Sequence, residues 1–121
     1  MTYKILVADD DFDNRTIATE SLESAGYQII QATNGFEALD AVAKEKPDLI
    51  FLDLSMPKLD GWQTVRRLKA LPEVSKIPVV AFTAHAMVGD DHKAKEAGCD
   101  DYLTKPCTPK KIIEKAKEWL K

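Results

Sequence analysis

Charged and hydroxyl side chains follow short apolar segments at several points of this 121-residue chain. The groups concerned are Asp9 and Asp10, Asp53, Thr83 and Lys105. Three carboxylates held close together repel one another, so some of them stay ionised only beside a cation. Hard oxygen ligands that leave room for water favour Mg²⁺. A site with Mg²⁺, a lysine ammonium and a threonine hydroxyl suits a phosphoryl group, because each of them offsets its negative charge.

Asp53 is the candidate nucleophile of such a site. The run Leu49–Leu52 before it has four large apolar residues and no alternation, as in a strand buried on both faces of a parallel sheet. In open α/β sheets, ligands bind in the crevice outside the carboxyl ends of the strands. A carboxylate there can attack phosphorus and form an aspartyl phosphate. The plainer alternative is that loop carboxylates cap helices or solvate turns, and that Thr83 satisfies a backbone group.

Five apolar segments alternate with five helical ones, which predicts a parallel sheet covered by helices on both faces. The expected strands are Ile5–Ala8, Tyr27–Ala32, Leu49–Leu52 with Asp53 at its end, Pro78–Phe82 and about Asp101–Thr104. If these strands are parallel, their carboxyl ends bring the carboxylates, Thr83 and Lys105 together. Four of the five expected strands end in a group that could bind a metal ion or a phosphoryl group. This favours a phosphoryl-transfer site over loop residues that only cap helices or solvate turns. We expect one domain over residues 1–121.

The helical segments carry their own start and stop signals. Gly26 is placed to end the first helix, which runs to about Ala25, and Gly98 to end the fourth. Asn34 with Gly35 opens the second helix. Apolar residues three or four apart mark the inner faces of the other helices. They are Trp62, Val65 and Leu68 before Pro72, and Ile112, Ile113, Ala116, Trp119 and Leu120 in the last helix.

Composition narrows the class of protein. The chain is 45% hydrophobic and 31% charged, and its net charge of -3 gives no indication of a nucleic-acid surface. No apolar run approaches a membrane span and no signal peptide is evident, so we expect a cytoplasmic protein without a membrane partner. Cys99 and Cys107 are too few and too unpatterned for a disulfide framework or a zinc site.

Taken jointly, the motifs resemble the signature set of the response-regulator receiver domain. They are Asp9-Asp10, Asp53-Leu54-Ser55-Met56-Pro57 with Asp60-Gly61, Thr83-Ala84 and Lys105-Pro106. The resemblance runs from about Lys4 to the C-terminus. It implies a flavodoxin-like (βα)5 fold, doubly wound, with a five-stranded parallel sheet in the order 2-1-3-4-5. It also implies a stand-alone phosphorylation switch of a two-component or phosphorelay pathway, which catalyses only its own phosphorylation and dephosphorylation.

The resemblance gives the site residues their expected roles. Asp53 accepts a phosphoryl group from a phosphohistidine of a histidine kinase or phosphotransfer protein. Asp10, Asp53 and the backbone carbonyl of Ser55 bind Mg²⁺ directly, while Asp9 holds a metal-bound water. Lys105 pairs with the carboxylate and then with the phosphoryl group, and the Lys105–Pro106 bond is expected to be cis.

The same resemblance predicts how the signal leaves the site. Thr83 and Tyr102 match the switch pair, in which the hydroxyl moves to the phosphate and the aromatic ring turns inward. The downstream protein partner is expected on the surface of the fourth helix, the fifth strand and the last helix.

Several further positions also have expected roles, and one of them, His85, allows two interpretations. In the family that the motifs resemble, the positions of Ser55 and His85 flank the path of an attacking water and tune its rate, but His85 fits a plain surface side chain equally well. His92 is expected to be solvent-exposed. The family commonly has a bulkier apolar residue after the Lys-Pro pair, where this chain has Cys107. We expect this difference to affect local packing and not the chemistry of the site. Trp62 and Trp119 are interpreted as packing anchors.

Other classes of protein fit less well. A haloacid-dehalogenase phosphatase needs a second aspartate two residues after the nucleophile, where this chain has Ser55. A flavodoxin-like FMN carrier needs a hydroxyl- and glycine-rich phosphate loop after the first strand, and Asp9, Asp10 and Asp11 would repel that phosphate. A receiver that docks without phosphorylation is disfavoured by the intact acidic pair, Thr83 and Lys105.

Overall fold

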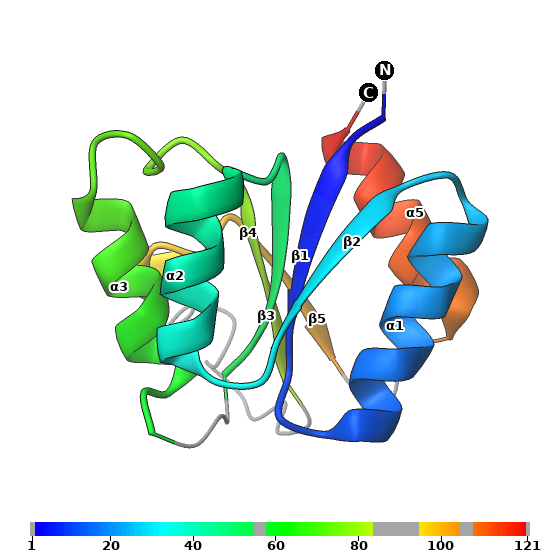
Figure 1. The fold of residues 1–121 in the computed structure, drawn as a ribbon, viewed down its shortest axis with the longest axis horizontal. Coiled ribbons are helices and arrows are strands. Elements are labelled where there is room, and N and C mark those ends of the chain that lie inside the picture. Colours follow the sequence, from blue (N-terminus) through cyan, green and yellow to red (C-terminus); the bar gives the residue numbers. More distant parts are fainter. Residues whose placement is uncertain (1, 55–57, 84–94, 105–107, 121) are drawn as a thin grey trace.

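A computed structural model of the chain contains one five-stranded sheet in which every strand pairing is parallel (Figure 1). It describes residues 2–54, 58–83, 95–104 and 108–120. The strands are β1 (Lys4–Ala8), β2 (Gln28–Ala32), β3 (Leu49–Asp53), β4 (Val79–Thr83) and β5 (Asp101–Thr104). Their order is β2-β1-β3-β4-β5. The predicted fold class and strand order are confirmed.

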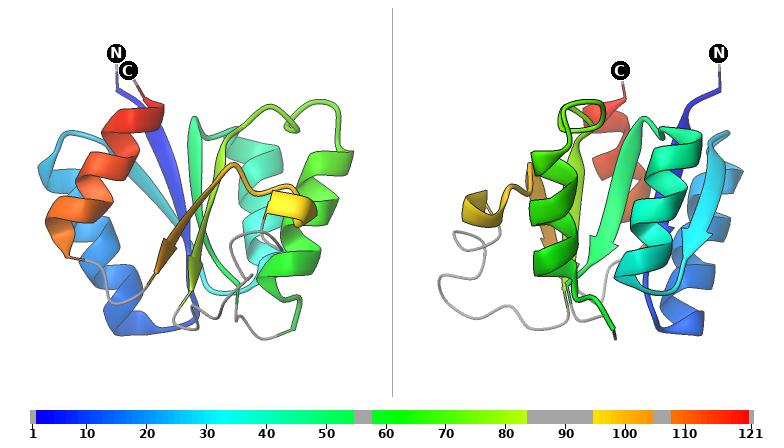
Figure 2. Two further views of the ribbon diagram at one scale, coloured as in Figure 1. Left: turned by 180° about the vertical axis from the view of Figure 1, so that it is seen from behind. Right: turned by 60° about the vertical axis from the view of Figure 1, so that its left-hand side comes forward.

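Helices cover both faces of the sheet (Figure 2). They are α1 (Phe12–Ser24), α2 (Gly35–Glu45), α3 (Gly61–Ala70) and α5 (Pro109–Trp119). Of the expected fourth helix, the structure describes a helical stretch only over residues 95–97. Gly98 follows with a φ of +115°, as predicted for a residue that ends a helix.

Alternation along the strands divides the core in two, because successive side chains point to opposite faces of a sheet. On one face Val7, Phe51 and Val80 pack with buried residues of α1 and α5. On the other face the strands pack with α2 and α3, through residues such as Val42 and Val65. All five residues of β3 are buried, as expected for its unbroken apolar run.

Each of α1, α2, α3 and α5 is preceded by a capping residue whose side chain accepts a hydrogen bond from a backbone N–H three residues later. These residues are Asp11, Asn34, Asp60 and Thr108. The first helix ends as predicted at Gly26, whose φ is +97°. The Gly26 and Tyr27 N–H groups donate to the carbonyls of Glu23 and Leu22 at 3.0 and 3.2 Å, which forms a Schellman motif.

Trp119 departs from the prediction. It lies in the last turn of α5 and is 37% exposed, so its assignment as a packing anchor is wrong. Its indole Nε1 donates to Asp101 Oδ2 at 2.9 Å, which explains why the ring lies at the edge of the core. Trp62, by contrast, is partly buried against the core on the α2–α3 face.

None of the helices in the described ranges has the length and apolar character needed to cross a bilayer.

Candidate functional site

Three carboxylates converge at the carboxyl ends of β1 and β3. One oxygen from each of Asp9, Asp10 and Asp53 lies within 4.8 Å of the others. Asp9 and Asp53 are only 5% and 4% exposed, whereas Asp10 is exposed. The predicted meeting of these residues is therefore present in the structure. Because Asp10 is exposed, the cluster is accessible from solvent although Asp9 and Asp53 are buried.

The turn from β1 into α1 holds Asp9 through hydrogen bonds of its backbone and of its carboxylate. The Asp9 N–H donates to the Ala32 carbonyl of β2 at 3.0 Å. Asp9 Oδ1 accepts the Asp11 N–H at 2.9 Å. Asp11 then caps α1, accepting the Asn14 N–H at 3.1 Å. The carboxylate of Asp9 is thus oriented by the same turn that starts the helix.

The end of β3 is held between β4 and the start of α3. The Leu54 N–H donates to the Phe82 carbonyl, and the Gly61 N–H donates to the Leu54 carbonyl, both at 3.2 Å. A Cβ at Gly61 would lie no more than 3.0 Å from backbone atoms of Asp53 and Leu54. Only glycine therefore allows α3 to begin so close to Asp53.

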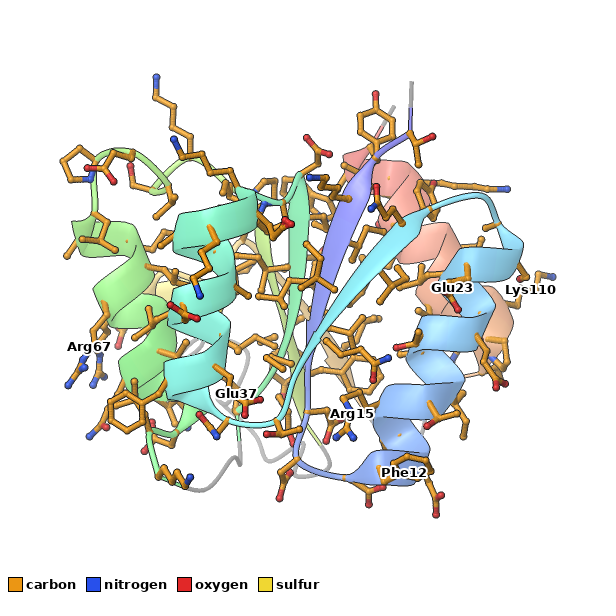
Figure 3. The ribbon with its side chains drawn as sticks, viewed as in Figure 1. Phe12, Arg15, Glu23, Glu37, Arg67 and Lys110 are labelled. Atoms are coloured by element: carbon orange, nitrogen blue, oxygen red, sulfur yellow. The ribbon has the colours of Figure 1, made fainter. Side chains whose placement is uncertain are left out.

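Arg15 is a neighbour of the acidic pair that the sequence interpretation missed. Its Nη1 donates to the Asp9 carbonyl at 2.9 Å and its Nε to Gln31 Oε1 at 3.0 Å. Figure 3 shows Arg15 on α1 near the end of the sheet, above Phe12. A signal was present, because Arg15 shares with Ala18 the helix face that turns toward the sheet. An arginine on that face requires polar partners.

The register of β4 and β5 places the expected switch residues on adjacent strands. Tyr102 pairs with Ala81, and Thr83 pairs with Thr104. Tyr102 is partly buried and packs against the core on the α2–α3 face. The backbone of Thr83 forms the last residue of β4, one residue beyond Phe82, which pairs with Asp53.

Other predicted residues lie outside the part of the chain that the structure describes. They are Ser55, His85, His92, Lys105 with Pro106, and Cys107. Their expected roles, including the cis Lys105–Pro106 bond, stay predictions.

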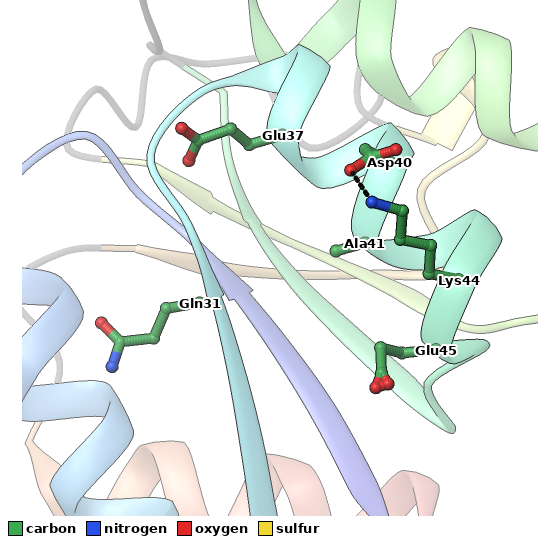
Figure 4. Close-up of a pocket in the computed structure, with 6 residues that line it drawn as sticks. All are labelled: Gln31, Glu37, Asp40, Ala41, Lys44 and Glu45. Carbon is green, nitrogen blue, oxygen red and sulfur yellow. Dashed lines mark ion pairs between the residues drawn. The ribbon is translucent and has the colours of Figure 1, made fainter.

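A hollow of about 530 Å³ lies between β2 and α2, and none of the three carboxylates lines it (Figure 4). Its lining includes Lys44, paired with Asp40 at 3.0 Å, and Glu37. Hydrogen bonds from the hydroxyl and then the N–H of Thr33 hold the pKa of Glu37 below its usual value. Asp40, Lys44 and Glu37 therefore already have partners, and the hollow gives no indication of a reaction site.

The chemistry of the donor set decides which metal the cluster fits. Carboxylate oxygens are hard ligands, and a site with three of them beside open solvent leaves positions for water. This is the coordination that Mg²⁺ prefers, and it does not suit zinc, which is bound mainly by nitrogen and sulfur. The residues present therefore fit a hard divalent cation.

Comparison with known proteins gives one consistent result. Residues 5–117 match the family model of the response regulator receiver domain. The polar-differentiation response regulator DivK of Brucella anthropi is 35% identical over 120 residues, which cover 99% of this chain and 98% of DivK.

Solved structures agree with that match. The chemotaxis response regulator CheY4 of Vibrio cholerae superposes with a TM-score of 0.93 at 26% identity, covering 99% of this chain and 100% of CheY4. The receiver domain of the sensor histidine kinase PA1611 from Pseudomonas aeruginosa has a TM-score of 0.90 at 29% identity, with 98% of each chain covered. That receiver holds a magnesium ion in its active-site cleft.

Proposed function

Because this chain belongs to the family of response regulator receiver domains, which are phosphorylation-dependent switches of two-component signalling, we propose that Asp53 is its phosphoacceptor. The observation that carries the proposal is the convergence of Asp9, Asp10 and Asp53 within 4.8 Å at the carboxyl end of the sheet. Asp53 is the member of the cluster that ends the central, fully buried strand. The family match over residues 5–117 supports residues 1–121 working as one receiver unit.

The acidic cluster would hold the cation of the reaction. Asp10, Asp53 and the backbone carbonyl of Ser55 are the proposed direct ligands of Mg²⁺, and Asp9 is the proposed partner of a metal-bound water. When bound, Mg²⁺ would neutralise charge on the phosphoryl oxygens. The PA1611 receiver, which contains magnesium in its cleft, supports this choice of metal.

Phosphoryl transfer to Asp53 needs no redox partner. A carboxylate oxygen of Asp53 attacks phosphorus, the P–N bond of a phosphohistidine breaks, and the histidine leaves with the bond's electron pair and takes up a proton. Lys105 and the Thr83 hydroxyl would each offset part of the charge on the transferred group. Hydrolysis removes the phosphoryl group: water attacks phosphorus, the P–O bond to Asp53 breaks, and inorganic phosphate and the free carboxylate are left. Ser55 and His85 would set the rate of this step from either side of the path of the water.

The proposed output is a two-state change that begins at Thr83. A phosphoryl group adds about -1.5 to -2 charges and strong acceptor oxygens at Asp53. Thr83 would move to donate to one of them, and Tyr102 would turn into the space behind it. The parallel pairing of β4 with β5 supports this coupling, since it places the two residues on neighbouring strands. The proposed partner surface is the fourth helix, β5 and α5.

Acetyl phosphate with Mg²⁺ tests the assignment. We expect the intact mass of the wild type to rise by one phosphoryl group, and the Asp53→Asn variant to stay unmodified. Asp40→Asn is the matched control, because Asp40 is an exposed carboxylate outside the cluster. Labelling that persists in Asp53→Asn would overturn the assignment.

A further inference from the structure

Arg15 connects three parts of the chain beside the acidic cluster. Its guanidinium donates from Nη1 to the Asp9 carbonyl at 2.9 Å and from Nε to Gln31 Oε1 at 3.0 Å. The Phe12 ring lies under it, 5.7 Å from Cζ to the ring centroid. Arg15 belongs to α1, Gln31 to β2 and Asp9 to the turn after β1, so one side chain links all three.

The bond to the Asp9 carbonyl has a geometric consequence. That carbonyl belongs to the peptide between Asp9 and Asp10, and a peptide is planar. Fixing the direction of the carbonyl therefore fixes the plane from which Asp10 starts. At its other end, the Asp9 N–H is held by Ala32 of β2. Both peptides that flank Asp9 are thus anchored through the same strand, one directly by Ala32 and one through Arg15 and Gln31.

The positive charge of Arg15 and its hydrogen bonds should change the affinity for a cation in opposite directions. A guanidinium near a cation site lowers the affinity for the cation, so neutralising Arg15 would strengthen binding if charge were its main effect. If orientation is its main effect, loss of the hydrogen bonds would weaken binding. The two explanations differ in the sign of one measurable quantity.

We propose that Arg15 is a positioning residue for the acidic pair, and that by holding the Asp9–Asp10 peptide it increases the affinity of the cluster for Mg²⁺. This inference rests on the function proposed above, since it takes the cluster to be a metal site. The planar fork of arginine is required, because a lysine ammonium cannot replace the two directed donors of Nε and Nη1. Gln31 and Phe12 serve to hold that fork in place.

Calorimetric titration with Mg²⁺ tests the role of Arg15. We expect Arg15→Met and Arg15→Lys both to weaken binding by about fivefold, the scale of one lost hydrogen bond. Gln31→Leu, which keeps the guanidinium but removes its second anchor, should weaken binding by about twofold. With saturating Mg²⁺, the rate of phosphorylation by acetyl phosphate should return to that of the wild type in each variant.

Arg67→Met is the matched control. Arg67 stacks over the Phe36 ring at 5.9 Å, much as Arg15 stacks over Phe12, but it lies on α3. This variant should bind Mg²⁺ as the wild type does. Circular dichroism and thermal unfolding of each variant establish that the protein is folded during the titration.

The outcomes separate the two proposals. Binding that is unchanged or tighter in Arg15→Met, while Asp10→Ala abolishes it, would overturn the role of Arg15 and leave the metal site standing. Wild-type affinity in Arg15→Lys would also overturn it, since the directed hydrogen bonds of the guanidinium would then not be needed. Binding that persists in Asp10→Ala would overturn the metal assignment, and with it the role of Arg15.

Discussion

Three negative charges lie close together at Asp9, Asp10 and Asp53, because one oxygen of each carboxylate is within 4.8 Å of the others. We expect repulsion among these charges to lower the stability of the fold when no cation is bound. Asn at position 9 removes one of the charges, and its amide oxygen can still accept the Asp11 N–H. We expect Asp9→Asn to raise the free energy of unfolding by about 1 kcal/mol in a chelator. Urea denaturation measures this change.

Addition of Mg²⁺ should reverse the order of the two proteins, because the wild type gains binding energy that the variant has lost. Asp13→Asn is the control, since Asp13 is an acidic residue of the first turn of α1 outside the cluster. Its loss should slightly destabilise the helix, as a negative charge near a helix N-terminus is favourable. If Asp9→Asn also destabilised the protein in a chelator, charge crowding would not be its main effect.

The side chain of Asp101, on β5, contacts Lys115 and Trp119 of α5. Burial acts to raise the pKa of Asp101, but hydrogen bonds from Lys115, the Trp119 indole and the Tyr102 N–H outweigh it, so this pKa lies below its usual value. Burial likewise acts to lower the pKa of Lys115, but hydrogen bonds to Asp101 and Glu118 raise it. The pair is therefore ionised throughout the neutral range.

The sign of the pH dependence follows from these directions. The folded-state pKa of Asp101 is below the unfolded value, so its contribution to stability is present above the unfolded value of about 4 and is lost as the pH falls through the folded one. The contribution of Lys115 to stability is present below its unfolded-state pKa. It is lost only as the pH rises through the folded-state pKa, which is the higher of the two. We expect Asp101→Asn to cost about 1 kcal/mol at pH 7 and progressively less below pH of about 4.

Urea denaturation at several pH values measures the difference between Asp101→Asn and the wild type. Asp40→Asn is the comparison, because the Asp40–Lys44 pair is 65% and 73% exposed at its two side chains. It should change stability by less than about 0.5 kcal/mol at every pH. A loss in Asp101→Asn that stayed constant down to the acid limit would mean that the carboxylate charge is not involved.

The start of α3 and the end of β3 approach each other more closely than any side chain allows. A Cβ at Gly61 meets backbone atoms of Asp53 and Leu54, which cannot yield without moving the proposed acceptor. We expect Gly61→Ala to lower the free energy of unfolding by about 1 to 3 kcal/mol and to slow phosphorylation of Asp53. Denaturation and the initial rate with acetyl phosphate measure the two effects.

Gly26→Ala separates the two effects at Gly61. Gly26 has a φ of +97° with no atom within 4 Å of an added Cβ, so alanine there is strained but displaces nothing. It should cost about 1 kcal/mol and leave the phosphorylation rate unchanged. Equal rates in the wild type and Gly61→Ala would show that α3 does not constrain Asp53.

Much of this architecture could be predicted because its signals are local. The unbroken apolar run before Asp53 predicted a central strand, and Gly26 ended α1 where expected. Trp119 was misassigned because helical periodicity does not show where α5 leaves the sheet. The bond from Arg15 to Gln31 spans 16 residues in sequence and depends on how α1 packs against β2. Such contacts follow only from the assembled fold.

Across the molecule, the phosphoryl group at Asp53 is expected to bias one equilibrium that links the site to the proposed partner surface. If Thr83 carries that coupling, Thr83→Ala should still bind beryllofluoride with Mg²⁺ but lose the conformational change. NMR spectra with and without beryllofluoride test this, with the Tyr102 signals as the readout. The coupling is contradicted if those signals shift in the variant as they do in the wild type.

The central claim is that Asp53 is the residue that carries the phosphoryl group. An acyl phosphate is reduced by borohydride to an alcohol, so a phosphorylated aspartate becomes homoserine and can be located by peptide mass spectrometry. After treatment with acetyl phosphate and Mg²⁺, we expect homoserine at position 53 and unchanged aspartate at positions 9 and 10. Homoserine at position 9 or 10, or none at position 53 in a protein whose intact mass shows phosphorylation, would contradict the claim.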